Sequence, residues 1–278
     1  MPKLSLDRNA HFLKNSFTLA HLADAAYAGH PASHDSFKAT VFSDSATAPI
    51  PFEDKETDTE GFVCGNSQHV VVAFRGTEPI KVMDWITDLS IRMVEQPDLG
   101  GYVHEGFERA LDAVWDKMIA SIKKLSGGGQ TLWVTGHSLG GALATLMAAW
   151  LPGNQRPFSL STFGQPRVGD HRFAGHYHQL HFRFVNNRDI VPTVPPRTLP
   201  GNFFPPAFYA HVGDLQFFDK SCNLVPASVD AELGVLPALV TALGPLSNLE
   251  AEATMLILNG LEDHKMKNYL RCLKHNQP

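Results

Sequence analysis

A serine lies between two glycines in the pentapeptide Gly136-His-Ser-Leu-Gly140, and a serine hydroxyl can act as a nucleophile toward carbonyl groups. The run Thr131 to Thr135 before it predicts a buried strand, and a helix rich in small residues is expected from Ser138 to Leu151. Glycines two residues before and after the serine permit a sharp strand-to-helix turn, because a Cβ there would collide with neighbouring backbone. The pattern therefore predicts that Ser138 is a nucleophile. The alternative is that Ser138 is an ordinary helix N-cap.

A serine hydroxyl needs a base that takes its proton, and the base needs an acid that orients it. Where the serine occupies such a strand-to-helix turn, the acid and the histidine follow it in that order. Asp189 is the favoured acid because it comes just after the predicted strand His181 to Val185, at the carboxyl edge of the sheet. Asp170 is interpreted instead as a helix N-cap and Asp214 as a turn residue.

The base must be one of the histidines that follow Asp189 along the chain. His211 lies in the strand-like run Tyr209 to Gly213, where it could be a packed and hydrogen-bonded side chain. His264 precedes a short helical end, and from a loop it could reach across the sheet. The residue pattern favours His264 but leaves His211 open. Three earlier histidines are closely spaced, but no cysteine or carboxylate joins them at metal-ligand spacing, so we predict a packed or solvated cluster and no metal site: His176, His178 and His181.

Short apolar runs that alternate with helical patterns supply the elements that would position these residues. Such alternation favours an α/β fold with a mostly parallel sheet covered on both faces. Residues 29 to 60 are polar and are interpreted as a long surface excursion. With no repeat or flexible linker, residues 1–278 are expected to form a single catalytic domain. The other expected elements are helices at 16–28 and about 106–125, strands at 69–74 and 158–163, and a late hairpin of 208–212 with 215–218.

Composition narrows the class of protein. The chain has 278 residues, of which 44% are hydrophobic and 18% charged, as in globular proteins. A net charge of −5 without a basic run argues against a nucleic-acid partner. Three widely spaced cysteines fit a reducing compartment or at most one bridge, and Cys64 is expected to pack as a small hydrophobe. The polar N-terminus resembles no signal peptide, which favours a cytoplasmic location or export by a non-classical route.

Several blocks of the sequence resemble the class 3 lipase family, the fungal-type triacylglycerol lipases of the α/β-hydrolase superfamily. The resemblance runs from the opening helix to the C-terminus and is densest from Val70 to Pro196. It implies the α/β-hydrolase fold, with a central, mostly parallel sheet and helices on both faces. The blocks are Val71–Thr77, Trp85-x-x-Asp88-Leu, Val103–Phe107, Gly136–Gly141, Thr162–Asp170, Asn187–Pro192 and Asp263–Leu270.

The resemblance implies that Asp189 and His264 complete a triad with Ser138, and that the backbone amides of Thr77 and Leu139 form the oxyanion hole. The implied activity is hydrolysis of carboxylic esters of acylglycerols or similar lipids through an acyl-serine, with no cofactor. Phospholipase A1 and feruloyl-type esterase are alternatives that use the same triad. An inactive relative that only binds lipid is the alternative outside enzymes.

Residues from about 78 to 90 occupy the position of the family's lid, which opens at a lipid surface. Wound as a helix, this segment has one polar stripe and an apolar remainder. The plain alternative is a core helix, and the stretch before Trp85 looks longer than in the fungal lipases, which leaves the lid's size open. A second apolar run, 233–246, is interpreted as core packing or as a lining of the acyl pocket. The predicted lid and substrate-binding residues are Ile80, Met83, Trp85 and Ile86.

Overall fold

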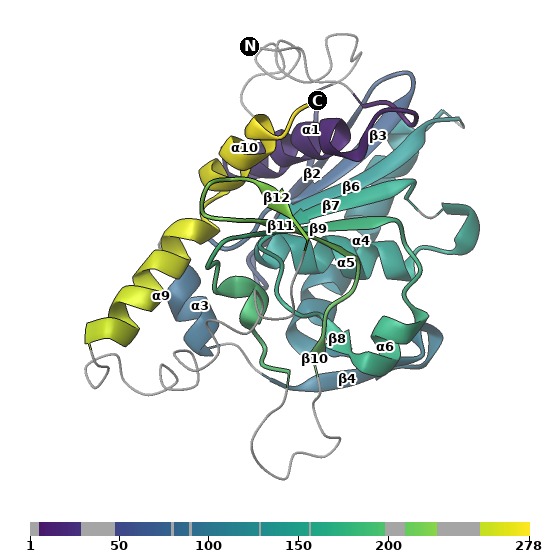
Figure 1. The fold of residues 1–278 in the computed structure, drawn as a ribbon. Coiled ribbons are helices and arrows are strands. Elements are labelled where there is room, and N and C mark those ends of the chain that lie inside the picture. Colours follow the sequence, from purple (N-terminus) through teal and green to yellow (C-terminus); the bar gives the residue numbers. More distant parts are fainter. Residues whose placement is uncertain are drawn as a thin grey trace.

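An eight-stranded sheet forms the centre of the computed structural model (Figure 1), which describes residues 6–28, 48–78, 81–88, 91–127, 129–155, 157–197, 209–226 and 251–278. The strand order is β1-β2-β3-β6-β7-β9-β11-β12, and the run from β3 to β11 is parallel throughout. This confirms the predicted mostly parallel sheet. The strands are β1 Ile50–Asp54, β2 Thr59–Gly65, β3 His69–Phe74, β6 Thr131–His137, β7 Ser159–Phe163, β9 His181–Asn186, β11 Asp214–Phe218 and β12 Leu224–Val225.

Helices cover both faces of this sheet. Helices α1 (Phe12–Ala25) and α10 (Met266–His275) lie on one face, and α4 (Glu105–Leu125) and α5 (Leu139–Trp150) lie on the other (Figure 1). Strand β3 is buried along its whole length because its side chains alternate between the two layers. Val72 and Phe74 join the core under α4 and α5, whereas Val71 packs in the cluster that contains residues of α1.

A smaller sheet and several short helices accompany the central sheet. A second, four-stranded sheet has the order β10-β8-β5-β4. Its strands are β4 Met93–Gln96, β5 Gly101–His104, β8 Gly169–Asp170 and β10 Tyr209–Ala210. The remaining helices are α3 Val82–Asp88, α6 His171–His176 and α9 Ala251–His264, with short 3-10 turns η1 Ala26–Ala28, η2 Pro97–Leu99, η3 Gly153–Gln155 and η4 Val191–Thr193. Among the described residues, no helix is both long and apolar enough to cross a membrane.

Two of the predictions about strands were wrong. Part of the supposed surface excursion of residues 29 to 60 is the hairpin of β1 and β2, which extends the sheet antiparallel to β3. Polar residues at this edge hide the strand signal, because β1 buries only Phe52. The late hairpin does not form either: β10 pairs with β8 in the small sheet, and β11 runs parallel to β9. The apolar run 233–246 lies outside the described residues.

The cysteines follow the sequence prediction of at most one bridge. Cys222, which follows β11, forms a disulfide with Cys272 of α10. Cys64 is buried in the core of β2, as expected of a small hydrophobe. The bridge therefore joins the sheet edge to the last helix of the chain.

His181, the first residue of β9, is expected to make the stability of the fold depend on pH. The side chain is buried, with Nε2 2.8 Å from Thr162 Oγ1 and Nδ1 3.2 Å from the Tyr177 hydroxyl. Burial, and secondarily the charge of Arg183, lowers the pKa of His181 from 6.5 to about 3. Because the folded state holds the neutral ring, its contribution is complete above the unfolded pKa and is lost as pH falls from 6.5 toward 3, by roughly 1.4 kcal/mol per pH unit.

We therefore expect the free energy of unfolding of wild type to fall between pH 7 and pH 5 by about 2 kcal/mol more than that of His181→Gln. Glutamine cannot take up a proton, so the difference isolates this one group. Urea unfolding at pH 5, 6 and 7 measures it. Parallel stability curves for the two proteins would show that His181 does not supply the pH dependence.

Candidate active site

Ser138 occupies the turn between β6 and α5, as the glycine spacing predicts. Its backbone has φ 57° and ψ −130°, a strained conformation for a residue with a side chain. The turn is held by the Ser138 amide, which donates to the Phe163 carbonyl at 2.9 Å. The spacing of the glycines has a direct cause, since a Cβ on Gly136 would lie 2.1 Å from the carbonyl oxygen of Gly140.

Asp189 lies just past the carboxyl end of β9 and is buried, with 3% of its surface exposed. The backbone amide of Val191 donates to its Oδ1 at 2.9 Å, and the hydroxyl of Tyr269, on α10, donates to its Oδ2. The competing acid Asp170 is the N-cap of α6 and accepts from the Phe173 amide at 2.8 Å, which confirms the sequence interpretation. The carboxylate of Asp189 is thus fixed by groups from two elements.

His264 meets Asp189 although 75 residues separate them. Its Nδ1 lies 2.9 Å from Oδ2 and 3.0 Å from Oδ1, and the imidazole is buried. Gly164, which follows β7 at φ 57°, makes room for this contact, because a Cβ there would come within 2.7 Å of both partners. The expectation of a loop-borne histidine was wrong, since His264 is the last residue of α9.

His211, the histidine that the sequence left open as a base, has a different environment. Its Nε2 lies 2.7 Å from the carbonyl oxygen of Pro192, in the η4 turn that follows Asp189. Burial, and then the charge of Arg183, lowers its pKa well below 6.5. His211 is therefore a packed, hydrogen-bonded residue that supports the turn after Asp189.

Two buried polar atoms near this pair have no hydrogen-bond partner among the described residues: the Oγ of Ser138 and the Nε2 of His264. The two atoms belong to neighbouring parts of the structure. The ring of His137, the residue before Ser138, stacks on the ring of His264 with centroids 4.4 Å apart. Buried polar groups are nearly always satisfied, so two orphans in one place call for an explanation. A hydroxyl and an imidazole nitrogen kept available for reacting groups provide one.

The predicted oxyanion residues flank Ser138. Gly76 is packed so closely against it that a Cβ on Gly76 would lie 2.9 Å from the Cβ of Ser138, and Thr77 is the next residue. The guanidinium of Arg75 anchors this segment by ion pairs to Glu60 at 2.6 Å and to Asp58 at 3.3 Å. Leu139 is the first residue of α5, where backbone amides have no partner within the helix. The roles of Thr77 and Leu139 stay predictions.

The predicted lid is partly described, as helix α3. Val82 and Ile86 are buried, whereas Lys81, Asp84 and Thr87 are exposed. The buried face, with the partly buried Met83 and Trp85 beside it, packs on Ile190 and Val191 of the turn after Asp189 and on Ile257 of α9. Helix α3 thus lies beside the helix that carries His264 (Figure 1), a contact that the sequence did not reveal. Ile80 lies outside the described residues.

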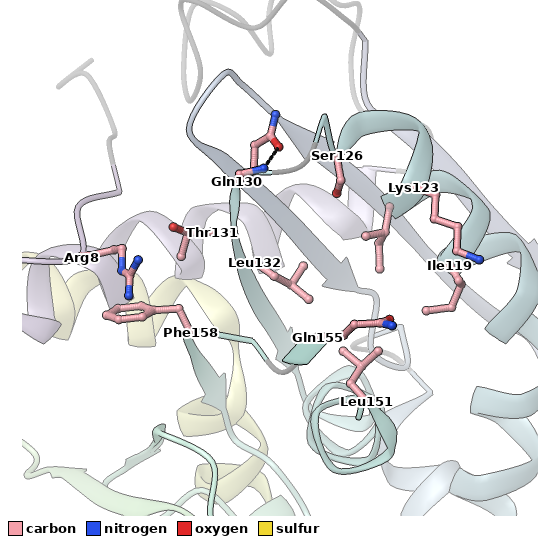
Figure 2. A pocket seen from close by; sticks show the side chains of 12 residues that line it. Arg8, Ile119, Lys123, Ser126, Gln130, Thr131, Leu132, Leu151, Gln155 and Phe158 are labelled. Atoms are coloured by element: carbon pink, nitrogen blue, oxygen red, sulfur yellow. Dashed lines mark hydrogen bonds between the residues drawn. The ribbon is translucent and has the colours of Figure 1, made fainter. Parts of the chain in front are cut away.

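A hollow of about 650 Å³, drawn in Figure 2 with its lining side chains, borders the first residues of β6. Ser138 follows the last residue of that strand. The lining of the hollow includes Thr131 and Leu132 at the start of β6, and Arg8, whose guanidinium lies 4.7 Å above the ring of Phe158. Among the described residues, no histidine or carboxylate lines it.

The fold described above and its similarity to solved lipase structures show that the chain has the α/β-hydrolase fold. The chain resembles lipase II from Rhizopus niveus, with a TM-score of 0.63 and 25% identity over 74% of this chain and 80% of that one. It is 35% identical over 158 residues to a secreted mono- and diacylglycerol lipase of Fusarium solani, covering 53% of this chain and 46% of that protein. A lipase of Rhizomucor miehei is 38% identical over 154 residues, 50% of this chain and 41% of that protein.

The family model described as lipase (class 3) matches residues 71–199, a range that contains Ser138 and Asp189. This match covers less than half of the chain, and together with the relatives it shows that the chain resembles the class 3 lipase family over this range. The chain spans less than half the length of those two curated relatives. His264 lies beyond the matched range.

Proposed function

We propose that this protein is a lipase or carboxylesterase that hydrolyses ester bonds of acylglycerols or similar lipids, within one catalytic domain. The observation that supports this best is the 2.9 Å contact between Asp189 and His264, beside a strained turn that carries Ser138. The similarity of residues 71–199 to the class 3 lipase family points the same way. The substrate is a lipid ester, and the protein contacts the lipid–water interface when it binds it.

The proposed reaction is acyl transfer in two halves. The Ser138 hydroxyl attacks the ester carbonyl and its proton passes to Nε2 of His264, while Asp189 holds the Nδ1–H and stabilises the imidazolium. The amides of Thr77 and Leu139 donate to the oxyanion of the tetrahedral intermediate, and loss of one such donor typically costs about 3–4 kcal/mol of barrier. The intermediate collapses, and the alcohol leaves with the proton from His264. Water then releases the acid by the same steps.

A panel of substrates tests the proposal and separates its alternatives. We expect hydrolysis of emulsified triacylglycerol and of long-chain p-nitrophenyl esters, and slower or no release of acid from phospholipid and feruloyl esters. Titration of released acid follows the natural lipids, and absorbance follows p-nitrophenol. Dominant activity on phospholipid or feruloyl ester would replace the lipase proposal, and binding of lipid without any turnover would support the inactive relative.

Helix α3 is the proposed lid, because its buried face rests on elements that carry Asp189 and His264. In the closed position this apolar face is hidden, and a lipid surface would stabilise its exposure. We expect the rate on a partly soluble ester such as tributyrin to rise abruptly once emulsion forms. Ile86→Ser should weaken the closed contact and reduce this rise at least threefold, whereas Thr87→Ser, on the exposed face, should preserve it. A smooth saturation curve in wild type would contradict a lid.

A further inference from the structure

His137, the residue before Ser138, contacts the helix end that carries the proposed base. Its ring is stacked on the ring of His264 at an interplanar angle of 27° and is 3% exposed. Its Nε2 lies 2.7 Å from the backbone carbonyl oxygen of His264, and its Nδ1 lies 2.7 Å from the hydroxyl of Tyr27. Both ring nitrogens are therefore engaged, and neither faces the reacting groups.

The direction of each hydrogen bond follows from the chemistry of its atoms. A carbonyl oxygen only accepts, so Nε2 of His137 carries the hydrogen and donates it to His264. Burial, and then the neighbouring His264, lowers the pKa of His137 well below 6.5, so its ring is neutral and Nδ1 accepts from the Tyr27 hydroxyl. The hydroxyl of Tyr27 also packs directly against the backbone of Gly76.

These contacts connect Gly76, through Tyr27 and His137, to the backbone of His264. The Gly76–Tyr27 step is a packing contact, and the other two steps are hydrogen bonds. Gly76 directly precedes Thr77, the proposed oxyanion donor, and fits so tightly that a Cβ on it would lie 2.4 Å from the Tyr27 hydroxyl oxygen. One end of this series of contacts is thus the oxyanion segment after β3, and the other is the end of α9. Tyr27, on the η1 turn after α1, holds them together through His137.

We propose that Tyr27 and His137 are positioning residues that fix the base His264 and the oxyanion segment relative to each other. This inference rests on the proposed esterase function. Neither residue touches the reacting atoms; they act through the main chain of the groups that do. A displacement of about 1 Å between catalytic groups can cost on the order of 100-fold in rate.

The first test compares two tyrosines whose hydroxyls each contact a histidine Nδ1. Tyr27→Phe removes the link to His137, and Tyr177→Phe removes the equivalent link to His181, outside the site. We expect Tyr27→Phe to lower kcat on a soluble p-nitrophenyl ester by about 10- to 100-fold with KM within twofold, because binding is kept and the transition state is misaligned. Tyr177→Phe should keep kcat within twofold of wild type. Thermal midpoints of both variants show whether each is folded.

The second test uses three replacements of His137. Glutamine can place an N–H near the position of Nε2, whereas asparagine can replace only the Nδ1 acceptor. Leucine is of similar size to glutamine but has no hydrogen-bonding group. We expect His137→Gln to retain at least tenfold more kcat than His137→Asn or His137→Leu. A purely structural role would make the leucine and glutamine variants alike.

The proposal is overturned if folded Tyr27→Phe keeps wild-type kcat, if Tyr177→Phe loses as much, or if His137→Leu matches His137→Gln. These outcomes differ from failure of the esterase function itself. In that case the wild type would show no Ser138-dependent turnover at all.

Discussion

Ser138→Ala is expected to lower kcat/KM for ester hydrolysis by about 10⁴- to 10⁶-fold, the loss typical when a triad nucleophile is removed. The substitution deletes only the Oγ, which has no hydrogen-bond partner among the described residues, so no stabilising contact is lost. Alanine retains the Cβ, and the strained turn at φ 57° is held by Gly136, Gly140 and the hydrogen bond from the residue 138 amide to the Phe163 carbonyl. We therefore expect a thermal midpoint within a few degrees of wild type and an intact ability to bind lipid.

The matched control is Ser161→Ala, in the neighbouring strand β7. Ser161 is equally buried, and its Oγ lies 2.9 Å from the Oγ of Ser16, so its loss should affect stability by about 1 kcal/mol and activity little. The two variants are compared by their initial rates on a soluble p-nitrophenyl ester. Circular dichroism checks that both proteins are folded. Turnover by Ser138→Ala at more than a hundredth of the wild-type rate would be incompatible with an acyl-serine at this residue.

The second large effect is expected from Asp189→Asn, which should lower kcat by about 10⁴-fold. The carboxylate accepts from Nδ1 of His264, from the Val191 amide and from the Tyr269 hydroxyl. Asparagine keeps the shape but places an NH₂ where one acceptor was, so it favours the wrong tautomer of His264 and no longer stabilises the imidazolium. This substitution leaves the substrate-binding surface unchanged, so KM should stay within a few-fold of the wild-type value.

Asp170→Asn is the control for this experiment, because Asp170 was the competing acid in the sequence. Asparagine caps a helix as well as aspartate does, so the bond to the Phe173 amide survives and activity should be kept within twofold. Steady-state kinetics on both variants at several pH values would settle the assignment. A loss in Asp170→Asn larger than that in Asp189→Asn would exchange the roles of the two carboxylates.

The fully buried strands and the turn at Ser138 were predictable from the sequence, because both depend on local patterns. Strand β3 has the predicted bounds, His69–Phe74, and β6 extends two residues beyond Thr135. Short, continuous apolar runs bounded by turn residues are typical of buried strands. The edge strand β1 buries a single phenylalanine, and β8 and β10 are only two residues long. None of these three strands therefore has an apolar pattern from which it could be predicted.

Pairings across the chain were harder to predict, because they depend on tertiary packing. Asp189 and His264 could be proposed from chain order and family resemblance, but Tyr27 and His137 are 110 residues apart and gave no pattern. The room that Gly164 leaves for the Asp189–His264 contact also appears only in three dimensions. Helix α9 was missed because consecutive apolar residues, Met255 to Leu258, obscure its periodicity.

Covalent labelling with a long-chain alkyl p-nitrophenyl phosphonate is the most direct test of the proposed triad. The reagent transfers its phosphonyl group only to a nucleophile that a neighbouring base activates, and it releases one p-nitrophenol. We predict one phosphonyl group per molecule, located on Ser138 by mass spectrometry of peptides, with labelling slowed at least 100-fold in Asp189→Asn. Stoichiometric inactivation with the label on any other residue would contradict the account.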